Sequence, residues 1–119
     1  MTDKIIQLVN TVYRTLGYGY SERVYHNAFE VLLRENNIRY ETERIVPILF
    51  YGHTIGNLRA DIIIDNEIVV ELKAVRNINN CMVQQAKNYL KLLDLHKAIL
   101  VNFPQVEDTD KCEINIVEI

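Results

Sequence analysis

The stretch from Arg59 to Val75, RADIIIDNEIVVELKAV, constrains the fold more than any other part of the chain. Two apolar runs rich in β-branched residues flank the polar residues 65–67, which is the pattern of two strands joined by a tight turn. Three charged side chains, Asp61, Glu71 and Lys73, nevertheless lie in these apolar runs. A fold for this chain therefore has to place charges in strands that are otherwise suited to a core.

The length of the turn decides where these charges lie. Side chains of a strand alternate between two faces, so Glu71 and Lys73 share one face of the second strand. A three-residue loop places Asp61 opposite Glu71 on the same side, whereas a two-residue loop places them on opposite faces. Two carboxylates about 5 Å apart repel each other, and a divalent cation bound through oxygen relieves that repulsion. Lys73 would then stand beside the metal.

The rest of the chain alternates between helical and strand patterns. Apolar residues at helical spacing predict helices over residues 4–16, after an N-cap at Ser21 to about residue 36, and around residues 82–93. Strands are predicted at 38–51, on both sides of 65–67, at 98–103 and at 114–119. The order α, α, β, β, β, α, β, β predicts an α/β fold, in which a mixed sheet with a three-stranded meander is flanked by helices.

Length and composition favour one intracellular domain. The chain has 119 residues and 49% apolar residues, enough for one core, so residues 1–119 are expected to form a single domain. It contains no apolar run of membrane-spanning length and no signal-peptide pattern, which predicts a soluble protein and leaves cytoplasmic, nuclear and viral settings open. Cys81 and Cys112 lie far apart and are expected to be unpaired. The net charge of −3 weighs against a strongly basic nucleic-acid-binding surface.

An acidic strand residue followed by Glu-x-Lys on the next strand resembles the signature of PD-(D/E)XK nucleases. Glu-x-Lys alone is common, but further segments agree in order and spacing. Together, over residues 4–103, they resemble the GxxExxR family, a branch of the PD-(D/E)XK superfamily. The Arg of that family's name corresponds to Tyr25 here, and a basic C-terminal end is absent. The matching segments are GYSE (19–22), VY (24–25), RAD (59–61), VELKAV (70–75), Gln85 with YL (89–90), and VNF (101–103).

The resemblance implies a restriction-endonuclease-like fold that hydrolyses phosphodiester bonds with a metal-activated water. Asp61 and Glu71 resemble the metal ligands, together with the backbone carbonyl of Leu72, and Mg²⁺ or Mn²⁺ suits such a site. Lys73 resembles the residue that orients the water or stabilises charge developing on the phosphate. Glu22 resembles the helical acid that reaches the metal directly or through water. Its helical spacing places it on or beside the buried stripe, although a solvent-facing Glu fits the pattern equally well.

Gln85 and Tyr89 lie one turn apart on the third predicted helix and resemble the QxxxY element of many enzymes in this superfamily. Taken alone, the same spacing also fits a core tyrosine and a boundary glutamine. Beside the Glu-x-Lys strand we favour a role in the active site. Phosphate contacts are expected from four basic residues, although isolated lysines commonly serve only solvation. These four are Arg59, Arg76, Lys87 and Lys91.

Three functional hypotheses remain at this point. The first is a metal-dependent endonuclease that acts on DNA. The second is a non-catalytic nucleic-acid-binding or accessory subunit that keeps the nuclease fold. The third is an α/β interaction module in which Lys73 forms an ion pair with Glu71. The negative net charge predicts weak binding to nucleic acid, and hence a homodimer or a partner subunit that completes the binding surface. No membrane partner is expected.

Overall fold

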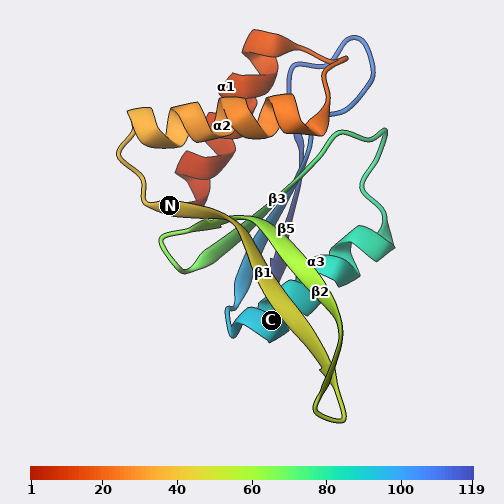
Figure 1. Ribbon diagram of the computed structural model, residues 1–119. Helices are drawn as coiled ribbons and strands as arrows, with labels where there is room; N and C mark the ends of the chain where they lie inside the picture. Colours follow the sequence, from red (N-terminus) through yellow and green to blue (C-terminus); the bar gives the residue numbers. More distant parts are fainter.

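The computed structural model describes residues 1–119 as three helices and five strands (Figure 1). The order of elements predicted from the sequence is confirmed, and the element ends differ from the predicted ones by only a few residues. Ser21 caps the second helix as expected, because its hydroxyl accepts a hydrogen bond from the Val24 N–H. The elements are α1 (Thr2–Leu16), α2 (Glu22–Glu35), β1 (Tyr40–Phe50), β2 (His53–Ile64), β3 (Ile68–Lys73), α3 (Asn80–Leu93), β4 (Lys97–Asn102) and β5 (Glu113–Glu118).

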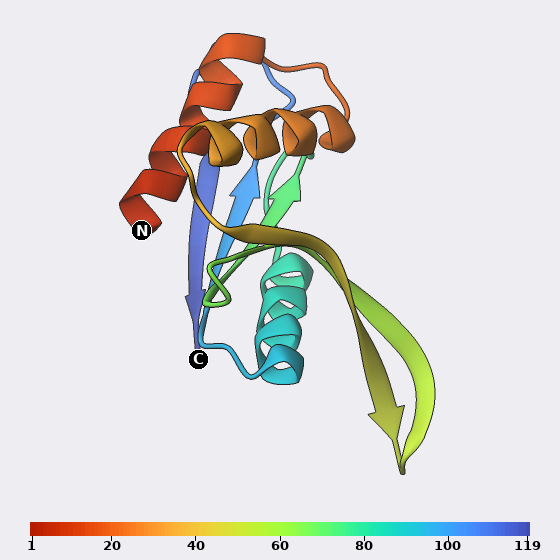
Figure 2. The ribbon, with the colours of Figure 1, turned by 60° about the vertical axis from the view of Figure 1, so that its left-hand side comes forward.

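The five strands form one mixed sheet in the order β1-β2-β3-β4-β5. Neighbouring strands are antiparallel except β3 and β4, which are parallel and are connected through α3. Figure 2 shows α1 and α2 at one end and on one face of the sheet, with α3 on the other face. This arrangement confirms the predicted α/β fold with a three-stranded meander.

Strand alternation divides the core between these two faces. Ile62, Ile64 and Leu72 belong to the larger cluster, which packs against α1 and α2. Ile63 and Val69 belong to the smaller cluster, which packs against α3. Alternation along β3 places Glu71 and Lys73 on the side of α3, together with Val69. Asp61 lies where the alternation of β2 is interrupted, because Ala60 and Ile63 both belong to the smaller cluster, and it lines a pocket with residues of α2.

Tyr25 lies in the larger core cluster. It is fully buried and stacks on Phe103, with ring centroids 4.3 Å apart. Its hydroxyl donates a hydrogen bond to the carbonyl of Gly17 at 2.6 Å, which ties α2 to the end of α1. The position that carries Arg in the GxxExxR name is thus occupied here by a core residue.

The hairpin of β1 and β2 extends beyond the rest of the sheet. The two strands pair from Tyr40 opposite Ile64 to Phe50 opposite His53, and their distal half projects away from the body (Figure 2). We call residues 45–58 the arm. Pairing shifts by one residue between Ile48 and Leu49, which leaves Ile55 without a partner as a β-bulge.

Two further expectations can be compared with the structure. Both cysteines are free, as predicted. None of the three helices is long and apolar enough to span a membrane.

Candidate active site

The loop between β2 and β3 fixes the relative position of the acidic residues. Ile64 pairs with Ile68 and Ile62 pairs with Val70, so the loop has three residues. Continuing this register places Asp61 opposite Glu71. Of the two loop lengths considered from the sequence, the structure has the three-residue one, which places Asp61 opposite Glu71.

Local backbone conformation explains why this loop forms. Asp65 and Asn66 have φ angles of 50° and 55°, in the left-handed region that Asp and Asn tolerate better than most residues. The N–H of Glu67 donates a hydrogen bond to the carbonyl of Ile64 at 2.9 Å and closes the turn. The polar tripeptide thus sets the register that brings the two carboxylates together.

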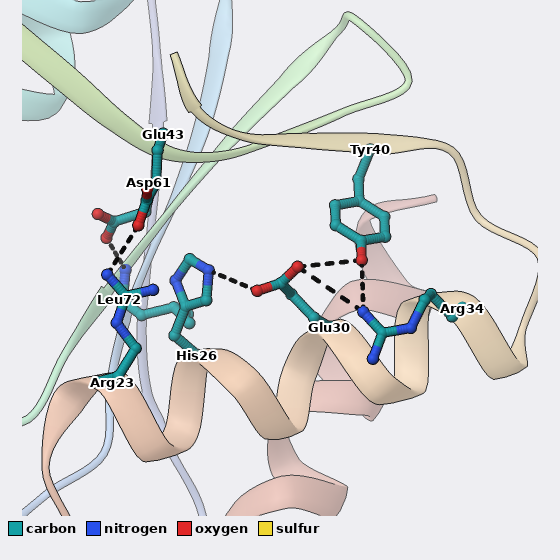
Figure 3. A network of polar contacts seen from close by, with 8 residues as sticks. All are labelled: Arg23, His26, Glu30, Arg34, Tyr40, Glu43, Asp61 and Leu72. Atoms are coloured by element: carbon teal, nitrogen blue, oxygen red, sulfur yellow. Dashed lines mark hydrogen bonds and ion pairs between the residues drawn. The ribbon is translucent and has the colours of Figure 1, made fainter. Parts of the chain in front are cut away.

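Asp61 lies where β2 and β3 separate. Its Oδ2 accepts a hydrogen bond from the Leu72 N–H at 3.0 Å (Figure 3), while backbone pairing ends at Ile62 and Val70. In a strand the N–H and C=O of one residue point to the same side. The carbonyl of Leu72 is therefore directed toward the gap that contains Asp61.

Glu71 is a buried carboxylate without a complete set of partners. Only 3% of the residue is exposed, and its Oε1 atom has no hydrogen-bond partner. Burial raises the pKa of the Glu71 carboxyl well above its usual range, and the nearby charge of Asp61 raises it further, while Lys73 lowers it. An orphaned carboxylate oxygen beside a second carboxylate is a donor set that fits a divalent cation.

Helix α3 closes the other side of this site. Lys73 Nζ lies 3.4 Å from Gln85 Oε1, and the Tyr89 hydroxyl donates a hydrogen bond to the carbonyl of Arg59 at 2.8 Å. Burial, together with the charges of Glu71 and Asp61, raises the pKa of Tyr89 to about 12. The structure thus brings Gln85 and Tyr89 to the Glu-x-Lys strand.

Lys73 does not form the ion pair that the interaction-module hypothesis requires. That hypothesis predicts an ion pair between Lys73 and Glu71, which lie two residues apart on one face of β3. None of the ion pairs in the structure includes Lys73, and its ammonium group contacts Gln85. The two charged residues of the Glu-x-Lys motif therefore remain free to act on a third group.

Glu22 stands at the edge of the site. It lines an open pocket of about 240 Å³ together with Arg23, His26, Arg59 and Asp61. Glu22 is largely exposed. Its pKa is nevertheless raised, mainly by partial burial of the carboxyl and secondly by the charge of Asp61. No group of three or more His, Cys, Asp or Glu side chains is arranged closely enough to hold a metal ion. Asp61 and Glu71 thus form a pair, and Glu22 faces the same pocket from α2.

Two neighbours of Glu22 add contacts that the sequence analysis did not use. Arg23 donates a hydrogen bond to Glu43 Oε1 at 2.7 Å, which links α2 to β1. The buried His26 has its Nε2 3.0 Å from Glu30 Oε2 (Figure 3). The i,i+4 spacing of His26 and Glu30 was the only local signal for either contact, because Glu43 lies on a different element.

The predicted phosphate-binding residues do not share one pocket. Arg59 lines the pocket with Asp61. Lys91 lies beside the base of the arm, and Arg76 lines a separate pocket with Lys111. Lys87 is partly buried on α3 and lines none of these pockets. Of the four basic residues, only Arg59 thus accompanies the acidic pair.

A polar clamp holds the segment that follows Lys73. The fully buried Asn102 accepts a hydrogen bond from the Val75 N–H and donates one to the Val75 carbonyl, both at 2.9 Å. Glu113 Oε1 accepts from Asn102 Nδ2 at 3.1 Å and from the Ile78 N–H at 2.9 Å. The VNF segment was noted in the sequence, but this positioning role was not, since no local pattern connects Asn102 to Val75.

Comparisons with known proteins agree with this geometry. A family model described as the PD-(D/E)XK nuclease superfamily matches residues 1–114. The crystal structure of a protein named SSO0001 is similar, with a TM-score of 0.61 and 27% sequence identity. The similarity covers 81% of this chain and 48% of SSO0001, so the chain spans about half the length of that protein. A search among curated proteins gave no match.

Proposed function

Because the chain belongs to the PD-(D/E)XK nuclease superfamily, we propose that it is a metal-dependent nuclease that cleaves phosphodiester bonds in DNA. The observation that carries this proposal is the orphaned Oε1 of the buried Glu71 beside the Asp61 carboxylate. Such a pair is costly in the absence of a cation. The segments quoted from the sequence further support membership of the GxxExxR branch.

We assign the metal ligands to Asp61, Glu71 and the carbonyl of Leu72. These are oxygen donors, which Mg²⁺ and Mn²⁺ prefer, and the open pocket leaves room for the waters that Mg²⁺ retains. When bound, the metal supplies an acidified water as nucleophile and charge stabilisation for the phosphate. Glu22, which faces the same pocket from α2, is assigned to the outer side of the site, where its carboxylate would accept a hydrogen bond from water.

The remaining assignments concern charge and position. Lys73 provides a positive charge on the same face as Glu71 and stabilises the phosphate oxygens in the transition state. Gln85 holds the Lys73 ammonium group at 3.4 Å, and Tyr89 fixes α3 to β2 through the Arg59 carbonyl. Arg59 donates to a substrate phosphate at the pocket rim.

A non-catalytic accessory role is the second candidate. It is favoured by one observation, the separation of Arg59, Arg76 and Lys91 among different pockets in a chain of net charge −3. Such a surface offers few phosphate contacts at one place. This candidate keeps nucleic acid as the partner and metal as a ligand, but it predicts no turnover.

A cleavage assay distinguishes the two candidates. Purified protein is incubated with single-stranded, duplex and branched DNA and with RNA, in Mg²⁺, in Mn²⁺ and in EDTA. The nuclease proposal predicts metal-dependent cleavage of at least one DNA substrate and no cleavage in EDTA. Metal binding without cleavage of any substrate would support the accessory role instead.

A variant pair guards this assay against a contaminating nuclease. Lys73→Ala removes the ammonium group from the site, whereas Lys4→Ala removes one from an exposed position of α1. Both proteins are purified in parallel and checked for folding by circular dichroism. Cleavage that persists at the wild-type rate in folded Lys73→Ala would show that the assigned mechanism is wrong.

A further inference from the structure

The arm exposes an apolar surface that the proposed nuclease function does not use. From Ile45 to Leu58 the chain contains no acidic residue, lysine or arginine, although 24% of the whole chain is charged. Five large apolar side chains of the arm are more than half exposed, and Tyr51 at the tip reaches 89%. We call these five residues the arm patch: Ile45, Leu49, Phe50, Tyr51 and Ile55. Because Leu49 and Phe50 are successive residues of β1, these side chains cover both faces of the arm and its tip. Exposed apolar surface of this extent is typical of an interaction site.

Backbone conformation at the tip shows that the aromatic residue is not there to form the turn. Tyr51 and Gly52 have φ angles of 48° and 79°, as in a two-residue hairpin turn of type I′. Asn is favoured at the first of these positions, and a bulky aromatic residue is unfavourable there. Asn, a polar residue, would also suit the exposure of this position to water better than Tyr. The sequence thus keeps Tyr51 against two local preferences, which is typical of a residue that serves a contact.

The chain also carries an apolar groove of matching character. Helices α1 and α2 enclose a groove of about 230 Å³ whose lining is almost entirely apolar. Val12 and Leu16 come from α1, while Val31 and Leu32 come from α2, and Val31 is 47% exposed. The groove is smaller than a site for a drug-sized ligand, so it suits individual side chains. Large aromatic anchors that enter such pockets commonly dominate binding energies.

The groove and the tip of the arm lie at opposite ends of the molecule. Figures 1 and 2 both show α1 and α2 at one end and the arm pointing away from them, and the longest extent of the chain is 48 Å. The arm therefore cannot reach the groove of its own chain. Two copies placed side by side in antiparallel orientation bring each tip next to the groove of the other.

We propose that the tip of the arm docks into the α1–α2 groove of a second copy of this chain, with the Tyr51 side chain in the groove, so that two copies form a reciprocal twofold dimer. A twofold arrangement closes, because each copy offers the same tip and the same groove. One face of the arm with its tip offers on the order of 300 Å² of apolar area, about half of the arm patch. Two such arm surfaces and two groove surfaces of similar size bury about 1,200 Å², the lower end of the range for stable interfaces.

Other occupants fit the arm less well. Nucleic acid is held through phosphate contacts from Lys and Arg, which the arm lacks. An anionic membrane surface attracts basic segments and repels a chain of net charge −3. Strand addition at the free edge of β1 is opposed by Pro47, since proline lacks the N–H that a sheet ladder uses. The occupant that fits best is therefore a second copy of this chain, docked through the side chains of the arm.

The first test measures mass in solution as a function of protein concentration, by analytical ultracentrifugation without metal or DNA. Wild type is expected to show a monomer–dimer equilibrium. Tyr51→Asn on the arm and Val31→Asn at the groove are each expected to raise the dissociation constant at least tenfold. Ile116→Thr removes an exposed apolar side chain of β5, outside both surfaces, and is expected to leave the constant unchanged.

Folding provides an internal check on the arm variant. Asn suits the left-handed conformation of position 51 better than Tyr does, so Tyr51→Asn is expected to melt at or above the temperature of wild-type monomer. Weakened association in a protein of undiminished stability cannot be attributed to unfolding. A lower melting temperature of the Tyr51→Asn monomer, together with unchanged association, would assign Tyr51 to the fold and overturn the proposal.

The second test identifies the contact itself. In a Cys81→Ser background, a Tyr51→Cys chain is mixed with a Val31→Cys chain under mild oxidation. A disulfide between the two different chains is expected, and neither chain alone should cross-link as fast.

Wild type that stays monomeric at about 100 μM, species larger than dimers, or a dimer that neither variant weakens would each overturn the proposal. So would loss of vesicle or DNA binding in Tyr51→Asn with no change in mass. Since no cleavage is measured, failure of the nuclease proposal leaves these outcomes unaffected.

Discussion

The two halves of β2 break the usual distribution of polar and apolar residues in opposite ways. At its end, beside β3, the strand places Asp61 next to the buried Glu71. At its beginning, in the arm, the same strand exposes Ile55 to solvent. The first region has charge where the fold favours apolar groups, and the second has apolar groups where water favours charge. Each is explained by something outside the chain, a cation in our proposal for the first and a second copy for the second.

The largest effect is expected from removing the charges of the first region. Glu71→Ala and Lys73→Ala should each reduce the cleavage rate by a factor on the order of a hundred or more, because each loses an interaction made with the transition state. Gln85→Ala should cost less, since Gln85 contacts Lys73 and not the substrate. Single-turnover rates on the best DNA substrate provide the measurement. An equal loss for all three variants would indicate that the site acts as one structural unit.

Metal binding should have the next largest effect, and it applies to the first region alone. Mg²⁺ at about 100 times its dissociation constant adds roughly 2.7 kcal/mol if it binds only the folded state. Asp61→Asn removes one negative charge at nearly constant shape, and the Asn carbonyl can still accept from the Leu72 N–H. The variant should be more stable than wild type in EDTA and should lose most of the metal shift. Melting curves of both proteins in EDTA and in Mg²⁺ give the measurement.

The opposite pattern would remove the metal site. If Asp61 were held by a structural ion pair, Asp61→Asn would be less stable than wild type in EDTA. That outcome, combined with no metal shift in wild type, would mean that the buried charge of β3 is compensated from within the chain. The contrast between the two halves of β2 would then no longer hold.

A smaller effect is expected from pH. Because the pKa of Glu71 is raised in the folded protein, the folded state holds a proton that the unfolded state has released above its ordinary pKa. Stability of the metal-free protein should therefore be highest below that ordinary pKa and fall as pH rises toward the folded pKa, by at most about 1.4 kcal/mol per pH unit for one proton. Denaturant titrations in EDTA across this window test it, and Glu71→Gln should flatten the slope. A slope unchanged by Glu71→Gln would assign the effect to another group.

The smallest effect concerns salt. Binding of DNA should be weak, and its dependence on salt should be shallow, since a chain of net charge −3 offers few phosphate contacts. Arg59→Ala should reduce the magnitude of the slope by about one, as for the loss of one phosphate contact. Tyr51→Asn in the uncharged arm should not change the slope at fixed oligomeric state. Fluorescence anisotropy at several salt concentrations, in Ca²⁺ to prevent cleavage, provides the measurement. Tight binding that is insensitive to salt would contradict this picture.

The sequence predicted the order of elements and the meander because each element has its own local pattern. Periodicity marks the helices, β-branched runs mark the strands, and residues 65–67 mark the turn. The grouping of Asp61, Glu71 and Lys73 could be inferred from the sequence for the same reason, since one short loop sets their register. For Glu22 the pattern left two alternatives, and the structure combines them, because the residue is exposed and also faces the pocket.

The arm could not be predicted in this way. Its residues have the composition of a buried strand, and nothing local distinguishes a strand covered by its own chain from one covered by another. Contacts between distant elements could not be predicted from the sequence either. Examples are Arg23 with Glu43 and Asn102 with Val75. Each depends on tertiary placement, which a pattern along the chain does not encode. The separation of Arg59 from Arg76 and Lys91 belongs to the same class.

The clamp of Asn102 and Glu113 has a consequence for synthesis on the ribosome. Asp61, Glu71 and Lys73 leave the exit tunnel before β4 and β5 and are joined by a short local hairpin. The segment after Lys73 is held only when β4 and then Glu113 have emerged, because Val75 and Ile78 bond to them. The nascent chain thus carries its charged residues well before the scaffold that orders them. The proposed active site therefore becomes ordered only after Glu113 has left the tunnel.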